Sequence, residues 1–291
     1  MITHPEKLLF PDDGITKGEL ASYYDDIAAV MLPHIRACPV TMERYPSGIG
    51  KQGFMHKDVS KGFPEWLTRV EVPKKGGTVH HPLVCDRQSL LWLANQNCIT
   101  PHVWTSRVPH LYQPDICVFD LDPSEDEPEV LRAAALAVRD LLAELGMPSW
   151  AKTSGSKGFH IVVPLDGNAG YDEVAAFADS AARVLVERDP RHLTLEFSKA
   201  DRGGRILVDV GRNGWGATFA AAYAVRAKGA APVSAPCTWE EIEQGQVAPQ
   251  TFTLRSMPER ISKVGDLWKD LPRRGHSLER ASEKLRGLAR R

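Results

Sequence analysis

Apolar positions recur along this chain with the period of a helix in some segments and with the pattern of a strand in others. The clearest helical pattern runs from Glu127 to Leu145, is rich in Ala and Leu, and stops before Gly146. Near the start, Thr16 is a suitable N-cap because Glu19 follows three positions later. Further helices are predicted over residues 16–31, 88–97, 171–188 and 239–244.

Strand patterns alternate with these helices. The most apolar run is Ile116–Asp122, which is rich in β-branched and aromatic residues and is ended by Pro123. Other strands are predicted over residues 38–45, 149–153, 159–165 and 205–210. Because the neighbours of the 116–122 run look like hairpin partners, the pattern favours an α+β architecture over a doubly wound parallel sheet.

Composition places the chain among ordinary soluble globular proteins. Its 291 residues are 43% hydrophobic and 25% charged, which suffices for one large domain or two small ones. The five cysteines are scattered and include no Cys-x-x-Cys pair, which argues against a zinc knuckle or a disulfide framework. No signal pattern and no apolar run of membrane-spanning length is visible, so we expect a cytoplasmic location without membrane partners.

The net charge of -1 hides an uneven distribution. Residues 120–129 are acidic, whereas Lys51–Lys75 and the last twenty residues are basic. A neutral total therefore leaves room for a polyanionic partner. We predict one catalytic domain over residues 1–271 and a basic tail or linker over 272–291, read as a frayed, solvated helix more readily than as a binding tail.

The end of the most apolar strand carries two carboxylates. Side chains alternate along a strand, so Asp120 and Asp122 point to the same face. Like charges side by side repel, and a divalent cation would relieve the repulsion, since Mg²⁺ and Mn²⁺ are held by one or two carboxylates plus substrate phosphates. The alternative is a solvated acidic turn, which the following Ser124–Glu127 would extend.

A polar, glycine-containing segment runs from Lys152 to His160 between two apolar strands. Its backbone amides, together with Ser154, Lys157 and His160, would form a donor-rich anion site. It is not a Walker A motif, because Gly-Lys-Ser/Thr is absent and a strand follows instead of a helix. The alternative is a glycine hairpin with incidental polar residues.

A third signal is Asp209, which lies in the β-branched run of residues 205–210. Burying this carboxylate unpaired would be costly. It could pair with Arg202 or Arg205, or it could join Asp120 and Asp122 as a third metal ligand. Three carboxylates beside a cationic phosphate site are what two-metal nucleotidyl transfer requires.

These three motifs together resemble those of the archaeo-eukaryotic primase superfamily, and more narrowly the polymerase domain of the bacterial end-joining ligase D. The resemblance runs from about Pro5 to Leu271. It implies a primase-polymerase fold with mostly antiparallel central sheets flanked by helices. Further matching segments are Glu43–Gly48, Phe54–Lys57, Leu91–Asn97 with His102, Ala222–Arg226 and Val247–Phe252.

The resemblance assigns roles residue by residue. The carboxylates of Asp120, Asp122 and Asp209 would hold two Mn²⁺ or Mg²⁺ ions as the catalytic centre. The triphosphate of an NTP or dNTP would be bound by Ser154, Lys157, His160, Arg226 and Arg44. His102 would lie near the sugar of the incoming nucleotide, where this family favours ribonucleotides.

DNA contacts are implied as well. Lys7 and Lys17 match the pair that grips the 5′-phosphate of a downstream strand, a task that compact ammonium groups perform without reading sequence. Phe54 is expected to stack on a template base. The chain departs from the family in having Met55 where a second aromatic residue is common and Gly211 where a bulkier residue is common.

The expected function is therefore template-dependent nucleotide addition, filling gaps and extending DNA ends during end joining, with NTPs preferred over dNTPs. Expected partners are DNA ends and gapped duplexes, an end-joining ligase and a DNA end-binding protein, which implies association with the nucleoid. No ligase signature is present, which fits either a stand-alone polymerase or an excised domain.

Three alternatives use the same residues differently. A primase-like enzyme would start chains without a primer. A non-catalytic module would bridge DNA ends through Lys7, Lys17 and the Lys51–Lys61 segment. A glycosidase would use paired carboxylates, but Asp120 and Asp122 share one strand face and should lie too close together for it.

Overall fold

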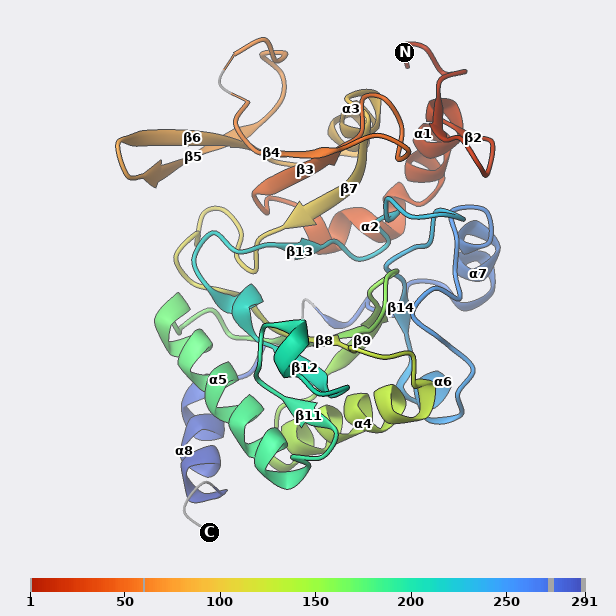
Figure 1. Ribbon diagram of the computed structural model, residues 1–291. Helices are drawn as coiled ribbons and strands as arrows, with labels where there is room; N and C mark the ends of the chain where they lie inside the picture. Colours follow the sequence, from red (N-terminus) through yellow and green to blue (C-terminus); the bar gives the residue numbers. More distant parts are fainter. Residues whose placement is uncertain (1, 60, 272–274, 289–291) are drawn as a thin grey trace. The chain divides into compact units, whose positions relative to one another are not determined.

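A computed structural model describes residues 2–59, 61–271 and 275–288 (Figure 1). The chain forms two compact units, each built from separate stretches of sequence. The first unit contains the described residues of 1–109, 218–235 and 251–269, and the second those of 110–217, 236–250 and 270–291. Among the described residues, no helix is both long and apolar enough to cross a membrane.

The first unit is built on a four-stranded antiparallel sheet with the strand order β13-β7-β3-β4. These strands are β3 (Val40–Arg44), β4 (Phe54–His56), β7 (Cys98–Val103) and β13 (Phe219–Ala220). The helices are α1 (Lys17–Asp26), α2 (Ala28–Ile35), α3 (Arg87–Asn95) and α7 (Met257–Val264). Two small antiparallel pairs complete it: β1 (Leu8–Phe10) with β2 (Ile15–Thr16), and β5 (Arg69–Lys74) with β6 (Gly77–Pro82).

The predicted capping box at the start of α1 is confirmed. The Thr16 hydroxyl accepts the amide of Glu19, and the Glu19 carboxylate accepts the amide of Thr16. The single helix predicted over residues 16–31 is instead two helices, because the backbone leaves helical geometry at Ile27.

The second unit is built on a six-stranded sheet with the order β11-β12-β8-β10-β9-β14. Its strands are β8 (Ile116–Asp122), β9 (Trp150–Thr153), β10 (Phe159–Pro164), β11 (Leu193–Thr194), β12 (Ile206–Asp209) and β14 (Pro236–Cys237). All neighbours are antiparallel except β11 and β12. Helices alternate irregularly with these strands, so the predicted α+β class is confirmed.

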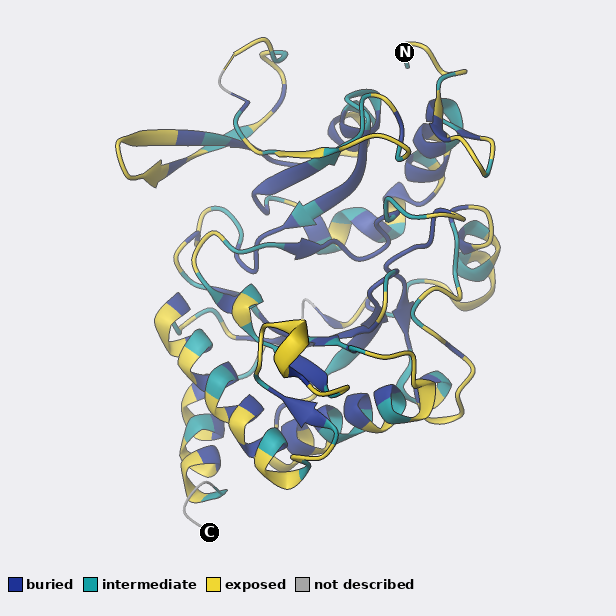
Figure 2. Ribbon diagram, in the orientation of Figure 1, coloured by how far each residue is buried: buried dark blue, intermediate teal, exposed yellow. Residues whose placement is uncertain are grey.

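Two long helices cover this sheet. Helix α4 (Pro128–Glu144) packs on β8 and β10, and α5 (Tyr171–Arg188) packs on β8 and on α4. Their apolar faces are buried, whereas their outer faces are exposed (Figure 2). Helix α4 stops before Gly146, as predicted, and the φ of 79° at Gly146 belongs to the left-handed region that favours glycine. The short helix α6 (Trp239–Glu243) follows β14.

The C-terminal segment contains helix α8 (Leu278–Leu288), which packs against α5. Its apolar side chains Leu278, Ala281 and Leu285 are buried, so the described part of the predicted tail is an amphipathic helix of the second unit. Four arginines of the predicted basic tail lie outside the described residues: Arg273, Arg274, Arg290 and Arg291.

Candidate active site

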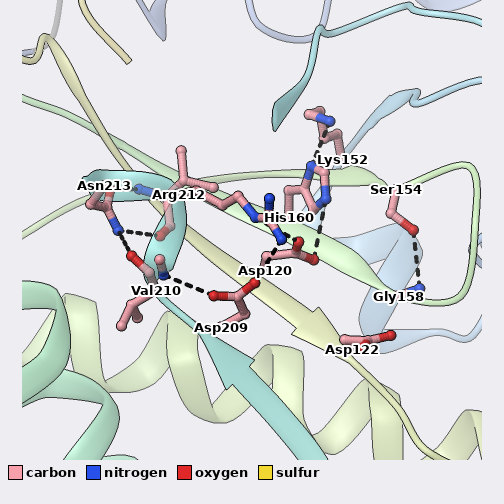
Figure 3. Close-up of polar contacts among 12 residues, drawn as sticks. Asp120, Asp122, Lys152, Ser154, Gly158, His160, Asp209, Val210, Arg212 and Asn213 are labelled. Carbon is pink, nitrogen blue, oxygen red and sulfur yellow. Dashed lines mark hydrogen bonds and ion pairs between the residues drawn. The ribbon is translucent and has the colours of Figure 1, made fainter. Parts of the chain in front are cut away.

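Four polar residues lie beside one another across four adjacent strands of the second unit. Lys152 on β9 pairs with His160 on β10, His160 pairs with Asp120 on β8, and Asp120 pairs with Asp209 on β12. Directly opposed residues on neighbouring strands project to the same face of a sheet. These four side chains, which we call the polar row, therefore gather on one face (Figure 3).

Contacts link three members of the row into a chain. The Nζ atom of Lys152 lies 2.7 Å from Nδ1 of His160, and Nε2 of His160 lies 3.2 Å from Oδ1 of Asp120. The first two residues are almost inaccessible, with 0% of Lys152 and 4% of His160 exposed. Burial in an apolar sheet strengthens each of these polar contacts.

The fourth member, Asp209, is joined to Asp120 by Arg212. This arginine lies in η2 (Gly211–Asn213), a short 3₁₀ helix directly after β12. Its Nη2 atom donates to Oδ2 of Asp209 over 2.8 Å, and its Nε atom lies 3.5 Å from Oδ2 of Asp120. Asp209 is therefore paired with Arg212, and not with Arg202 or Arg205, the partners considered from the sequence as the alternative to a metal ion.

An asparagine that the sequence analysis missed holds this arginine loop against the sheet. Asn213 is fully buried, and its side chain exchanges two hydrogen bonds of 2.8 Å with the backbone of Val118. It also donates to the carbonyl of Val210 over 2.9 Å. Only its place just after the Asp209 strand could have indicated such a role.

The electrostatics of the row keep Asp120 ionised. Burial opposes ionisation of this carboxyl, but the contact with His160, followed by the charges of Arg212 and Lys152, holds the pKa of Asp120 below its ordinary value. The carboxylate form is thus the one present at neutral pH.

Asp122 lies on the same strand face but outside the row, opposite Leu207 on β12. Its Oδ2 atom accepts from Nη1 of Arg202 over 3.0 Å. The Arg202 guanidinium is buried and also donates to the carbonyls of Asp122, Glu196 and Phe197. Arg202, one of the two arginines considered as a partner of Asp209, therefore holds the last residue of β8, Asp122, in place.

Within the described residues, no group of three or more His, Cys, Asp or Glu side chains is arranged as a metal site. Each of the three carboxylates contacts a cationic or imidazole group of the protein instead. The donor set nevertheless suits a hard divalent cation, because Asp120, Asp122 and Asp209 offer only carboxylate oxygens from one region of the sheet. Arg212 is 39% exposed on its side chain, so it is the most displaceable of the cations at these carboxylates.

The segment between β9 and β10 is a tight turn closed by Ser154. The Ser154 hydroxyl accepts the amides of Ser156 and Gly158, both over 3.1 Å. Two of the amides predicted to bind an anion are therefore engaged inside the turn, and Ser154 itself is buried. Lys157 stands exposed on the turn and offers its ammonium group to solvent.

Gly158 is required by close packing of this turn on β8. A Cβ atom at this position would lie 1.7 Å from the carbonyl oxygen of Leu121. Behind the turn, Nε2 of Gln250 donates to the carbonyl of Ser156 over 2.7 Å. A small cavity of about 160 Å³ lies beside it, lined among others by Lys157 and Phe159.

A separate polar cluster lies on the sheet of the first unit. His102 on β7 contacts Glu43 on β3, with 3.1 Å between Nε2 and Oε2, and the Tyr45 hydroxyl donates to Oε1 of Glu43. Burial alone would raise the pKa of Glu43, but His102, the Thr100 hydroxyl and the charge of Arg226 lower it to about 2. His102 and Arg226 thus both act on the partly buried carboxylate of Glu43.

Arg44 and Phe54 form a second pair in this unit. The Arg44 guanidinium lies 5.4 Å from the centre of the Phe54 ring and donates through Nε to the carbonyl of Gln96. Phe54 and Met55 lie on the edge strand β4 and are 47% and 52% exposed. The Phe54 ring and the Met55 side chain are therefore both partly exposed.

Lys7 and Lys17 are neighbours, as their predicted role requires, but Lys17 is not an ordinary surface lysine. It is 3% exposed, and its Nζ atom donates to the Thr3 hydroxyl over 3.2 Å. Burial, followed by the charges of Lys7 and Arg44, lowers the pKa of Lys17. Such a crowded pair of cations would be relieved by an anion.

Comparison with known proteins gives a consistent result. A family model described as "LigD, primase-polymerase domain" matches residues 16–268. The multifunctional non-homologous end joining protein LigD of Mycolicibacterium smegmatis is 34% identical over 269 residues, which are 91% of this chain and 35% of that protein. Its Pseudomonas aeruginosa counterpart is 35% identical over 275 residues, which are 92% of this chain and 32% of that protein.

A solved structure agrees with these matches. The polymerase domain from Mycobacterium tuberculosis ligase D in complex with DNA is 32% identical, and the alignment covers 95% of this chain and 99% of that one with a TM-score of 0.89. This chain spans about a third of the length of the LigD proteins from M. smegmatis and P. aeruginosa.

Proposed function

Because this chain belongs to the LigD primase-polymerase domain family, we propose that it is a template-dependent nucleotidyltransferase that extends primers at DNA breaks. The observation that carries the proposal is that Asp209 on β12 lies directly opposite Asp120 on β8. Asp122 follows Asp120 two residues later on the same strand. The names of the relatives support a role in end joining, and the DNA bound to the M. tuberculosis domain supports DNA as the substrate.

The three carboxylates would hold the divalent cations of this reaction. When bound, such cations lower the pKa of an attacking hydroxyl and stabilise the charge of a leaving pyrophosphate. The protein's own contribution is to keep Asp120 ionised through His160, Arg212 and Lys152. Asn213 holds the Arg212 loop on β8, so that this guanidinium stays beside the carboxylates.

The triphosphate would be bound by the turn between β9 and β10. Lys157 is exposed there and can approach phosphate oxygens as a point charge. His160 can present an N–H group from the polar row, and Ser154 shapes the turn by accepting two of its amides. Arg44 and Arg226 belong to the first unit, and their role in binding the triphosphate stays a prediction.

Residues of the first unit would bind the sugar and the DNA. We assign His102 to the nucleotide sugar, oriented by the partly buried carboxylate of Glu43. Phe54 would stack on a template base, and the adjacent Lys7 and Lys17 would bind a downstream 5′-phosphate. An end-joining ligase and a DNA end-binding protein would supply the remaining steps of repair.

Primer extension tests this proposal. A labelled primer across a short gap with a downstream 5′-phosphate is incubated with Mn²⁺ and either NTPs or dNTPs. We expect extension that prefers NTPs and is abolished in the double variant Asp120→Ala/Asp122→Ala. Binding of the gapped DNA without any addition of nucleotide would contradict the proposal and favour a non-catalytic end-binding module.

A further inference from the structure

We propose that Lys152 is a positioning residue that fixes the His160 ring as an N–H donor facing Asp120 and the nucleotide phosphates. The expected effect on nucleotide binding rests on the proposed function, whereas the position of the proton on the His160 ring concerns only the polar row. Lys152 belongs to β9, an inner strand between β10 and β14. Its role differs from that of Lys157, which is exposed on the turn.

The burial of Lys152 calls for a specific partner. Its side chain is among the largest that are fully buried, with 0% exposed. Burying an ammonium group is costly unless acceptors compensate for the lost water. One such acceptor is Nδ1 of His160, 2.7 Å from the lysine Nζ atom.

That contact decides which nitrogen of His160 carries the proton. A lysine ammonium has three donors and no acceptor, so Nδ1 must offer its lone pair to it. In a neutral imidazole the other nitrogen, Nε2, then carries hydrogen.

The orientation of this N–H explains its use. Nε2 of His160 lies 3.2 Å from Oδ1 of Asp120, so the donor points at the acidic end of the row. The opposite tautomer would aim a lone pair at a carboxylate and at any phosphate oxygen bound there. Lys152 thereby makes His160 a donor to anions and withholds Nε2 as a metal ligand.

Nitrogen NMR of the wild-type protein tests the assignment without any change in the fold. In a sample labelled with ¹⁵N at histidine, the His160 signals are assigned by their loss in His160→Gln. We expect a protonated Nε2 and an unprotonated Nδ1 at neutral pH. A protonated Nδ1 would overturn the proposal, whether or not the protein extends DNA.

Substitution then tests the consequence. Lys152→Met keeps the buried stem but removes the donor, and Lys284→Met on α8 removes a lysine charge from the same unit at an exposed position. A hydrogen bond to a charged group corresponds to about a ten- to hundredfold change in binding. We therefore expect Lys152→Met to weaken nucleotide binding in calorimetry, and to raise KM more than it lowers kcat, whereas Lys284→Met does neither.

A double-variant cycle separates positioning from general destabilisation. If Lys152 acts through His160, adding Lys152→Met to His160→Gln should change nucleotide affinity less than about twofold. Fully additive effects, or an unchanged His160 tautomer in Lys152→Met, would overturn the proposal. If the wild-type protein shows the expected tautomer but does not extend a primer, the proposed function fails and the role of Lys152 in orienting His160 stands.

Discussion

Asp120 and Asp209 lie directly opposite each other on the antiparallel strands β8 and β12, and the Arg212 guanidinium contacts both carboxylates. Two like charges at this separation are tolerated because a cation lies beside them. The pair therefore explains both why an arginine follows β12 and why this face of the sheet suits a divalent cation.

Removing Arg212 should strengthen cation binding. Without its guanidinium, Asp120 and Asp209 lose a competing positive charge, so Arg212→Gln should bind Mn²⁺ several-fold more tightly in the absence of nucleotide. Calorimetric titration measures the change, with Arg183→Gln as a surface control, since the exposed Arg183 guanidinium pairs with Asp179 on the same helix α5. Equal or weaker binding by Arg212→Gln would contradict this account of the site.

Local patterns predicted much of the second unit. Helix α5 spans the predicted residues 171–188, and β8 ends at Asp122 as its apolar run indicates. These elements depend on short-range periodicity and on end signals such as Gly146, which sequence displays directly. Strands β5 and β6 were not predicted, because this exposed hairpin buries few apolar side chains.

The site was harder to predict because it depends on strand order. Sequence placed Asp120, Asp122 and Asp209 together only as a hypothesis, and the order β9-β10-β8-β12 that aligns the row arises from long-range pairing. Neither the burial of Lys152 nor the hydrogen bonds of Asn213 to Val118 can be predicted from composition or from hydrophobic periodicity.

Substitution of Gly158 should disrupt the turn beside the row. A Cβ atom there would lie 1.7 Å from the Leu121 carbonyl, so Gly158→Ala must displace backbone rather than a flexible side chain. We expect a loss of more than about 2 kcal/mol in the free energy of unfolding. Gly214→Ala, whose Cβ would meet only an ordinary contact at 3.6 Å, should change stability by less than about 1 kcal/mol. Equal effects of the two in urea unfolding would refute the packing argument.

Arg202 should contribute to stability as well as to the site. Its buried guanidinium donates to the side chain of Asp122 and to three backbone carbonyls. Arg202→Met would leave those acceptors unsatisfied and should lower the free energy of unfolding by about 2–3 kcal/mol. Arg191→Met, at an exposed position of the same unit, is the matched control in chemical denaturation. A loss no larger than that of the control would be inconsistent with the observed hydrogen bonds.

Glu43 should make the first unit sensitive to acid. The pKa of Glu43 falls from 4.5 in the unfolded chain to about 2 in the folded protein. As the pH is lowered, the unfolded chain therefore takes up the proton before the folded protein does. The stabilisation is complete above pH 4.5 and is lost as the pH falls through 2. The contribution is on the order of 2 kcal/mol. Glu43→Gln should therefore be less stable at neutral pH and should lose less stability between pH 4.5 and 2. Parallel pH profiles of the two proteins would contradict this assignment.

The most direct test of the account is primer extension by Asp209→Asn on gapped DNA, compared with Asp179→Asn on the surface of α5. We predict that Asp209→Asn folds and binds the DNA like the wild type but extends the primer at least about a hundredfold more slowly, whereas Asp179→Asn extends it normally. Extension by Asp209→Asn at the rate of the control would show that the row of carboxylates is not the catalytic centre.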